Sequence, residues 1–295
     1  MKSGLIVVNK EAGFTSFDVV AKLRGILHMK KIGHTGTLDP SATGVLPIVL
    51  GKATKAVNYI EDHDKTYIAS LCLGKTTDTY DGDGAFVFSS DKVVSKETFL
   101  LELEKFLGKQ KQIPPMYSAK KVNGKKLYEL AREGIEVERK PEDIEIYSLK
   151  LLSFEFPFAS IEVNCSKGTY IRSLIHDLGQ NLGCGAYMTN LNRTKACGFS
   201  LNESYTLDEI QTLRDEDRLD EIFHPIQELF SFEEVHGKEL SNVLLENGNK
   251  IPFEMVEECK GSLGNLVCFY HYDGRFAGLF KKESDCYKPE KFFLE

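Results

Sequence analysis

The alternation of hydrophobic and polar positions predicts a chain in which strands and helices intermix. A continuous apolar run over residues 4–9 ends at a polar turn and is typical of a buried strand. Between residues 65 and 74 polar and apolar positions partly alternate, which predicts a strand with one apolar face. The side chains on that face are Tyr67, Ala69, Leu71 and Leu73. Without regular strand-helix-strand alternation, the pattern favours an α+β fold with a mixed, mainly antiparallel sheet.

Helical spacing and capping residues predict the positions of the helices. Thr15 or Ser16 can cap a helix that carries apolar residues at helical spacing. Thr169 can cap another, which ends at Gly183. Further helices are expected over 53–60, 95–107 and 125–132, and two strands over 144–165. The apolar run 45–50 contains Pro47, which favours an edge or bulged strand.

The composition shifts near residue 231. Residues 207–229 are acidic and weakly helical, whereas the chain after 231 consists of short β-like pieces. Glycine turns separate these pieces at 248, 261, 264, 274 and 278. We therefore expect one domain over 1–230 and a small β domain over 231–295.

Length and cysteine content exclude several classes of protein. A chain of 295 residues can bury a sizeable core without disulfide staples. Its seven cysteines form no Cys-x-x-Cys pair, so neither a disulfide framework nor a zinc site is indicated. The N-terminal apolar run is far shorter than a signal peptide core or a membrane span. We expect a soluble protein of the cytoplasm.

The net charge of −7 argues against a nucleic-acid partner only when it is taken whole. Residues 203–260 hold 16 acidic and five basic side chains, a local net of −11, so the rest of the chain sums to +4. Residues 1–60 carry a net of +5 and residues 105–140 a net of +6. Either basic run alone is as consistent with a solvated surface, but the two together favour a polyanionic partner.

The densest candidate for chemistry is the glycine-rich loop 33–44. Its glycines allow a backbone that approaches a ligand closely, and Pro40 biases Asp39 toward an extended conformation that projects its carboxylate. Composition alone favours an ordinary turn residue. The loop also lacks the lysine and the spacing of a phosphate-binding P-loop. The acidic stretch 78–84 fails the spacing of a calcium loop and is interpreted as a turn.

A second candidate is Arg172, which the sequence places in the first turn of a helix just beyond a strand. A cation is unfavourable at that end of the helix dipole, and a residue placed against its local preference is a candidate for function. A structural ion pair or a phosphate contact explains it equally well. A third candidate, Tyr67, is by itself best interpreted as ordinary core.

Taken together, these segments resemble the TruB family of tRNA pseudouridine-55 synthases. The resemblance extends in order over about residues 4–200. The segments that carry it are 33–44 (GHTGTLDPSATG), 65–67 (KTY), 74–79 (GKTTDT), 117–120 (YSAK), 124–128 (GKKLY), 165–172 (CSKGTYIR) and 177–179 (DLG). It implies a pseudouridine-synthase fold, a central mixed sheet flanked by helices, with a small C-terminal PUA-like β domain.

The resemblance also implies an isomerisation in which a flipped uridine of the tRNA T-loop is rejoined to its sugar through carbon. Asp39 would be the essential carboxylate, Arg172 its ionic partner, and Tyr67 the ring that stacks on the base and takes part in proton transfer. His34 would fill the gap that the nucleotide leaves. Thr37, Tyr170 and Leu191 would line the substrate pocket. Neither a metal nor an organic cofactor is implied.

Residues 105–140 would form a thumb-like insertion that grips the T-arm phosphates. Its expected contacts are Lys120, Lys121, Lys125 and Lys126, which position the RNA rather than specify its sequence. The family commonly has a Lys-Pro-x-Gly turn near the start, where this chain has residues 10–13 (KEAG) and keeps Lys10 as a structural or phosphate contact. The C-terminal part carries eight basic and 12 acidic residues, which disfavours a strong electrostatic contact with the acceptor stem.

The partner implied is tRNA, bound by a monomeric protein. No association with a membrane, no obligatory protein partner and no guide RNA are implied. Two alternatives remain open at the level of sequence. One is a tRNA-binding or folding protein of the same fold that lacks chemistry, and the other is a glycosylase that lets water finish the reaction.

Overall fold

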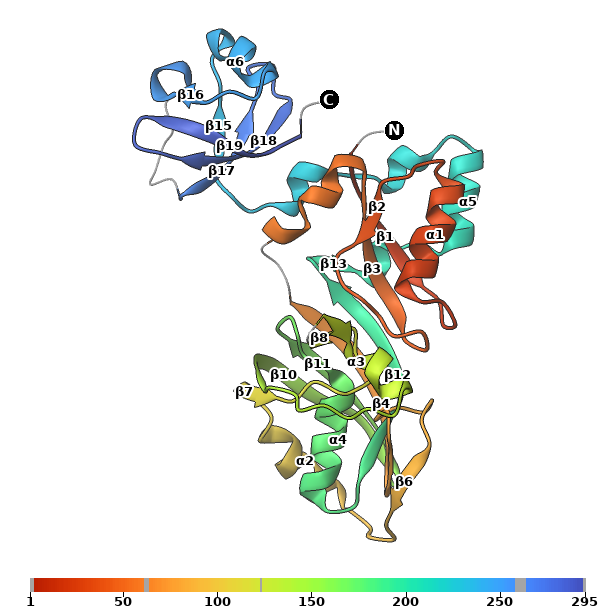
Figure 1. Cartoon of the computed structure of the whole chain (residues 1–295). Helices are drawn as coiled ribbons and strands as arrows, with labels where there is room; N and C mark the ends of the chain where they lie inside the picture. Colours follow the sequence, from red (N-terminus) through yellow and green to blue (C-terminus); the bar gives the residue numbers. More distant parts are fainter. Residues whose placement is uncertain (1–2, 61–63, 123, 258–263, 294–295) are drawn as a thin grey trace.

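The computed structural model describes residues 3–60, 64–122, 124–257 and 264–293, which form two separate large β-sheets (Figure 1). In the larger sheet the strand order is β14-β1-β3-β12-β4-β11-β10-β7, with β2 paired to β3 and β13 paired to β12. All pairs are antiparallel except β12 with β3. The strands are β1 (Gly4–Lys10), β2 (Ile32–His34), β3 (Thr43–Leu50), β4 (Lys65–Leu73), β7 (Gly108–Gln112), β10 (Glu142–Glu155), β11 (Phe158–Cys165), β12 (Ala186–Ala196), β13 (Phe199–Ser200) and β14 (His224–Pro225).

The expected strand at 65–74 is confirmed as β4, and its apolar face is buried. The central strand β12 was not predicted. It pairs with β4 on one side and with β3 on the other, although its sequence contains Asn190, Asn192 and Arg193. The sheet-forming tendency of this segment is therefore set by its neighbours rather than by its own apolar pattern.

The prediction of an edge strand at Pro47 is wrong, because β3 lies between β1 and β12. Pro47 faces Val7 in the register with β1, and its carbonyl accepts a hydrogen bond from the amide of Thr35 on the other side (3.2 Å). The nitrogen of a strand residue points to the same side as its carbonyl. The missing N–H of Pro47 thus faces the end of β2, where no ladder bond is lost.

Helices cover one face of the larger sheet. They are α1 (Ser16–Ile26), α2 (Lys96–Glu104), α4 (Ile171–Leu182) and α5 (Leu207–Asp215), and each contributes buried side chains to the main core with β1, β3, β4, β11 and β12. Thr15 is the N-cap of α1, where it forms a capping box with Asp18. The helix expected over 53–60 is instead two 3₁₀ helices, Gly51–Lys55 and Val57–Tyr59.

The opposite face of β1 and β3 packs against the second sheet through a separate apolar cluster that includes Cys268, Leu279 and Phe293. This sheet has the order β15-β17-β18-β19-β16 and its own small core. Its strands are β15 (Glu234–His236), β16 (Ile251–Pro252), β17 (Leu266–Tyr270), β18 (Phe276–Lys282) and β19 (Cys286–Phe292), with the short helix α6 (Asn242–Glu246). The expected change to β structure after residue 231 is confirmed. The glycine turn expected at 261 lies outside the described residues.

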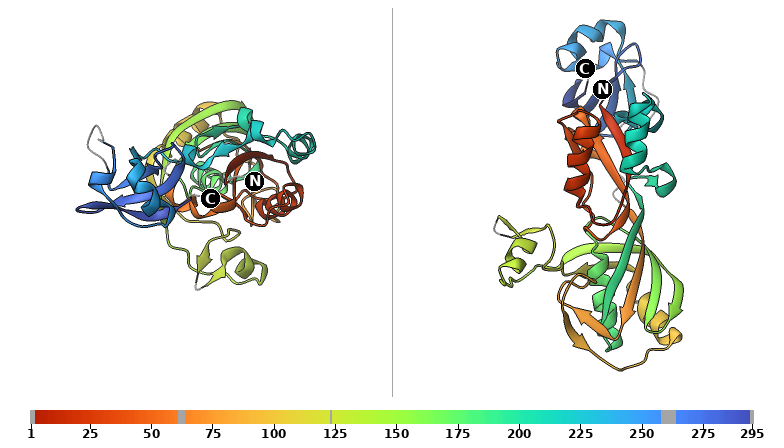
Figure 2. Two further views of the ribbon diagram at one scale, coloured as in Figure 1. Left: turned by 90° about the horizontal axis from the view of Figure 1, so that it is seen from above. Right: turned by 90° about the vertical axis from the view of Figure 1, so that its right-hand side faces the viewer.

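Residues 113–141 project from the larger sheet as a separate lobe (Figure 2). The lobe contains the paired strands β8 (Lys121–Val122) and β9 (Lys125–Lys126) and the helix α3 (Leu127–Arg132). The insertion expected over 105–140 therefore begins later, because β7 already belongs to the main sheet. The strands β5 (Lys75–Thr77) and β6 (Phe86–Ser89), which follow β4 in the chain, pair antiparallel as a separate two-stranded sheet.

No helix in the described part of the chain is long and apolar enough to cross a membrane.

Candidate active site

Asp39 lies on the loop that joins β2 to β3. The loop is fastened to the turn before α1: the amide of Leu38 donates to Ser16 Oγ (2.9 Å), and the amide of Gly13 donates to the carbonyl of Pro40 (2.9 Å). The side chain of Asp39 keeps 33% of its surface exposed. The carboxylate is thus held by a fixed backbone while it remains open to a ligand.

Lys10 supports this loop through hydrogen bonds of its buried ammonium group. Its side chain is only 1% exposed, and Nζ donates to the carbonyls of Glu11 (2.9 Å), Phe14 (2.6 Å) and Pro40 (3.1 Å). Burial lowers the pKa of Lys10 to about 8. Of the two roles left open by the sequence, these contacts correspond to the structural one, because the ammonium group is buried among carbonyl oxygens.

Arg172 meets Asp39 through a forked contact. Nε lies 3.0 Å from Oδ2 of Asp39, and Nη2 donates to Oδ1 at 3.1 Å. This bidentate geometry gives the strongest common pairing of a guanidinium with a carboxylate. The side chain of Arg172 is 5% exposed, so the pair is largely shielded from water on the arginine side.

Asp81 occupies the other edge of the same guanidinium. Nη1 of Arg172 donates to Asp81 Oδ2 (3.2 Å) and to the carbonyl of Thr79 (3.3 Å), and Nη2 donates to the carbonyl of Tyr117 (2.8 Å). With the contacts to Asp39, all three nitrogens of the guanidinium have polar partners. Asp81 lies in the acidic stretch 78–84 that the sequence predicts to be a turn. It has no local signal of a role, because its partner lies 91 residues away.

Burial and the charge of Arg172 act in opposite directions on the pKa of Asp39. Burial raises the pKa of the Asp39 carboxyl above its usual value, and the positive charge of Arg172 opposes that effect. The negative charge of Asp81 raises the pKa further. The arginine is therefore the main group in the site that favours the ionised carboxylate.

The start of α4 is positioned by an unusual cap. Tyr170, and not Thr169 as expected, is the N-cap residue, and its side chain makes no capping hydrogen bond. Gln112 of β7 holds the backbone of Tyr170 instead: its Oε1 accepts from the amide of Tyr170 (2.8 Å), and its Nε2 donates to the carbonyl of Tyr170 (3.0 Å). Arg172 is consequently held two residues into the helix, as the sequence predicted.

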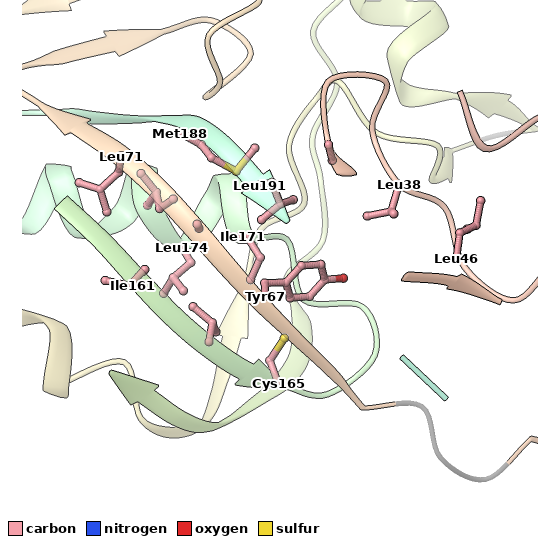
Figure 3. Packing of buried hydrophobic residues seen from close by; sticks show 14 of the residues in the cluster. Leu38, Leu46, Tyr67, Leu71, Ile161, Cys165, Ile171, Leu174, Met188 and Leu191 are labelled. Atoms are coloured by element: carbon pink, nitrogen blue, oxygen red, sulfur yellow. The ribbon is translucent and has the colours of Figure 1, made fainter. Parts of the chain in front are cut away.

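Tyr67 projects from β4 between the main core and the loop. It is 7% exposed and belongs to the core cluster, and its hydroxyl points toward Leu38 and Leu46 (Figure 3). Burial raises the pKa of Tyr67, whereas the charge of Arg193 lowers it. Arg193 was also missed by the sequence analysis, since it lies on the unpredicted strand β12.

A cavity of about 540 Å³ brings most of the expected residues together. Its walls include Thr37, Asp39, Tyr67, Lys120, Tyr170, Arg172 and Leu191. The volume is in the range of pockets that hold one small ligand. Among the described residues there is no group of three or more His, Cys, Asp and Glu side chains that could hold a metal ion.

A second cavity of about 650 Å³ lies on the other side of Asp39 and Arg172, which line both. His34 and Lys126 line this second cavity, together with Thr37. Burial and the charge of Arg193 lower the pKa of His34. Lys10 and Lys125 line neither cavity. Lys125 is instead 61% exposed in the projecting lobe, 3.7 Å from Glu133.

Comparison with known proteins places most of the chain in one family. Residues 24–171 match the family model described as "TruB family pseudouridylate synthase (N terminal domain)". Residues 172–231 match the model described as "tRNA pseudouridylate synthase B C-terminal domain". The second match ends where the strands of the smaller sheet begin.

Relatives of similar length extend this comparison. A protein of Clostridium kluyveri named "tRNA pseudouridine synthase B" is 42% identical over 99% of this chain and 99% of its own length. One of Dehalococcoides mccartyi with the same name is 39% identical over 99% of this chain and 96% of its own. Among solved structures, a chain of the "Crystal Structure of a Cbf5-Nop10-Gar1 Complex" has a TM-score of 0.74 and 25% identity, covering 99% of this chain and 85% of that one. The chain therefore belongs to the TruB family of pseudouridylate synthases.

Proposed function

We propose that this protein is a tRNA pseudouridine synthase that isomerises the uridine at position 55 in the T-loop. The observation that carries the proposal is the Asp39–Arg172 fork, which lies at a cavity that also contains Tyr67. Membership of the family and full-length relatives that bear this name support the same conclusion.

The reaction requires the base to leave the RNA stack. Flipping a nucleotide costs a few kcal/mol, and stacking and polar contacts in the pocket offset that cost. The ring of Tyr67 supplies a stacking surface, and Tyr170 and Leu191 supply further walls of the cavity. In this proposal His34, at the second cavity, occupies the place that the flipped nucleotide leaves in the T-loop.

Asp39 acts in its ionised form. It attacks the sugar, attacks the base or removes a proton from the sugar, and each of the three routes needs a carboxylate rather than a carboxylic acid. A base stacked over Asp39 removes its remaining water, which raises the carboxyl pKa further. The ion pair and the hydrogen bond from Arg172 oppose this effect. Exclusion of water also prevents hydrolysis of the intermediate, which would leave abasic RNA and free base.

The projecting lobe of residues 113–141 binds the T-arm backbone. Lys125 and Lys126 stand on β9, and Lys120, at the first cavity, pairs with Glu142. Contacts of lysine with phosphate fix the register of the RNA but carry no sequence information. The folded shape of the T-arm supplies the specificity, as is usual for RNA. In this proposal the lobe gives the enzyme its own contact with RNA, so no guide RNA is needed. We also propose a monomer without an obligatory partner protein.

Residues 1–230 form the catalytic domain in this proposal, and residues 231–295 form a PUA-like domain directed at the acceptor stem. The smaller sheet has a core of its own, which supports the division. The excess of acidic over basic residues in this part of the chain predicts a weak contact with RNA.

The product of the reaction tests the proposal against its alternatives. A T-arm stem-loop transcript incubated with the full chain is expected to gain pseudouridine without release of uracil, as measured by nucleoside analysis. Free uracil or abasic RNA would favour a glycosylase. Tight binding without any conversion would favour a tRNA-binding protein that lacks chemistry.

A further inference from the structure

Arg193 is a second buried arginine at the Asp39 loop. It lies on β12, opposite Tyr67 of β4 and beside Gly44 of β3, and is 1% exposed. No motif in the sequence singled it out. Its position places a permanent positive charge between the loop and the tyrosine.

The hydrogen bonds of Arg193 join three backbone carbonyls. Nε donates to Val45 (2.7 Å), Nη1 to Thr37 (3.4 Å) and Nη2 to Gly36 (3.2 Å). Gly36 and Thr37 directly precede Leu38 and Asp39 in the loop. The guanidinium therefore fixes the backbone that carries the candidate catalytic carboxylate.

Arg193 differs from Arg172 in its counter-charge. Within the described residues, no carboxylate lies within 4.0 Å of the Arg193 guanidinium, whereas Arg172 has two. The residue opposite Arg193 across the β12–β4 pair is Tyr67, and the charge of Arg193 lowers the pKa of its phenol. Burying a cation is costly unless hydrogen bonds or a negative partner compensate it. Three carbonyls supply hydrogen bonds to Arg193, and a negative partner would stabilise it further.

The proposed isomerisation can supply such a negative partner at Tyr67. The bond between C1′ and N1 breaks and a bond between C1′ and C5 forms, so N1 must gain a proton and C5 must lose one. The hydroxyl of Tyr67 can give its proton to N1 of the detached base and, as phenolate, take the proton from C5 afterwards. The proton count then balances without another reactant.

We propose that Arg193 is a positioning residue for this reaction, which aims the Tyr67 oxygen at the base and stabilises the negative charge that forms on it during proton transfer. The inference rests on the proposed function. It explains why a buried arginine is placed against a phenol and carbonyls rather than against a carboxylate.

Other groups that face Tyr67 do not supply this charge. Cys165 of β11 is buried, which raises the pKa of its thiol to about 11, and it stays neutral near pH 7. Asp39 raises the pKa of Tyr67, as a neighbouring negative charge must. Lys65 of β4 and Arg193 both approach Gly36 of the loop. Arg193 Nη1 and Lys65 Cε each lie 3.7 Å from the position that a Cβ atom would take at Gly36. Burial and Arg193 lower the pKa of Lys65.

A direct test follows the titration of Tyr67 in the full chain. Tyrosine labelled with ¹³C at Cζ reports the ionisation of each ring, and Tyr67→Phe assigns the signal. Arg193→Gln is expected to raise the titration midpoint of Tyr67 by about one pH unit or more, since a neighbouring cation is removed. Arg193→Lys keeps a charge but loses the fork, so a smaller rise of about a third of a unit is expected. An unchanged midpoint in either folded variant would overturn the proposal.

Single-turnover conversion of a T-arm stem-loop provides the second readout. Arg193→Gln is expected to slow conversion more than about tenfold while the RNA dissociation constant stays within about threefold, because affinity comes from phosphate contacts. Lys195→Gln, at an exposed position of the same strand, serves as the matched control and should change neither quantity. If the variant converts RNA at the wild-type rate, the role assigned to Arg193 is wrong. If the wild type converts no RNA, the proposed function fails, while the titration still reports on the Arg193–Tyr67 contact.

Discussion

The two sides of the Asp39 loop each hold a buried arginine, but the charges around them differ. On one side Arg172 is flanked by the carboxylates of Asp39 and Asp81. On the other side Arg193 donates to carbonyl oxygens and lies opposite Tyr67 across the β12–β4 pair. Arg172 holds the carboxylate of Asp39 ionised before the reaction starts. Arg193 is suited to stabilise a negative charge that forms on Tyr67 only during the reaction. Both rest on the loop that carries Asp39.

The largest effect is expected from removing the shared cation on the first side. Arg172→Met removes the cation from Asp39 and Asp81, and burial then favours the protonated form of Asp39. We expect conversion to fall by about a thousandfold or more and the free energy of unfolding to fall by about 3–5 kcal/mol. Single-turnover assays and urea unfolding measure the two quantities. Arg172→Lys, which keeps the charge without the fork, should retain more stability than Arg172→Met; equal losses would show that the charge is not what matters.

A smaller effect is expected from Asp81→Asn, which leaves Arg172 with one carboxylate. The charge of Asp81 raises the pKa of Asp39, so its removal must lower that pKa. Asp39 then stays ionised to a lower pH, and the acid limb of the pH profile of single-turnover conversion should move to lower pH. The plateau rate should fall about tenfold or more, since Nη1 of Arg172 loses an anchor. Asp83→Asn should shift the limb less. A limb that moves to higher pH would contradict the charge balance described for this side.

Binding should be separable from the chemistry on both sides of the loop. Replacing Lys125 and Lys126 with alanine is expected to weaken binding of a T-arm stem-loop and to lower the slope of log affinity against log salt by about one to two. Filter binding at several salt concentrations measures the slope. The adjacent pair Lys281 and Lys282 on β18, also replaced with alanine, is the matched control. An unchanged slope in the Lys125 and Lys126 variant would show that these lysines of the lobe do not contact the RNA phosphates.

The smallest effect concerns Asp177, a carboxylate on α4 with Arg172. Burial alone raises the pKa of Asp177 to about 6. A raised pKa means that the folded state binds the proton more tightly, so the associated stability is present below about pH 4 and is lost as the pH rises through 6. Asp177→Asn is expected to increase the free energy of unfolding at pH 7 by roughly 1–3 kcal/mol, with conversion unchanged. Glu104→Gln, at an exposed site on α2, should leave the stability unchanged. A destabilised Asp177→Asn variant would reveal a partner for this carboxylate.

Sequence reasoning located one side of the loop better than the other. Asp39 and Arg172 stood in motif-rich segments with local signals, a proline that follows the aspartate and a cation at the wrong end of a helix. Asp81 and Arg193 had no such signal. Asp81 is recognisable only through contact with a distant arginine, and Arg193 lies on β12, whose polar residues hide its central place in the sheet.

The same limit explains the errors in the fold. The strand β4 was predicted because its alternation is local and its buried face is continuous. The interior position of β3 was not, because Pro47 is tolerated only through the way β2 ends beside it. The N-cap of α4 was misplaced by one residue, because Gln112, 58 residues away, holds the backbone of Tyr170. Contacts between distant segments, rather than local propensity, decided the last two of these cases.

The most direct test of the central claim is a comparison of the wild type with Asp39→Asn in one assay of binding and conversion. Asparagine keeps the size of the side chain and removes the charge that Arg172 holds. The account predicts that Asp39→Asn binds a T-arm stem-loop within a few fold of the wild type and forms no pseudouridine. Conversion by Asp39→Asn at the wild-type rate would contradict it.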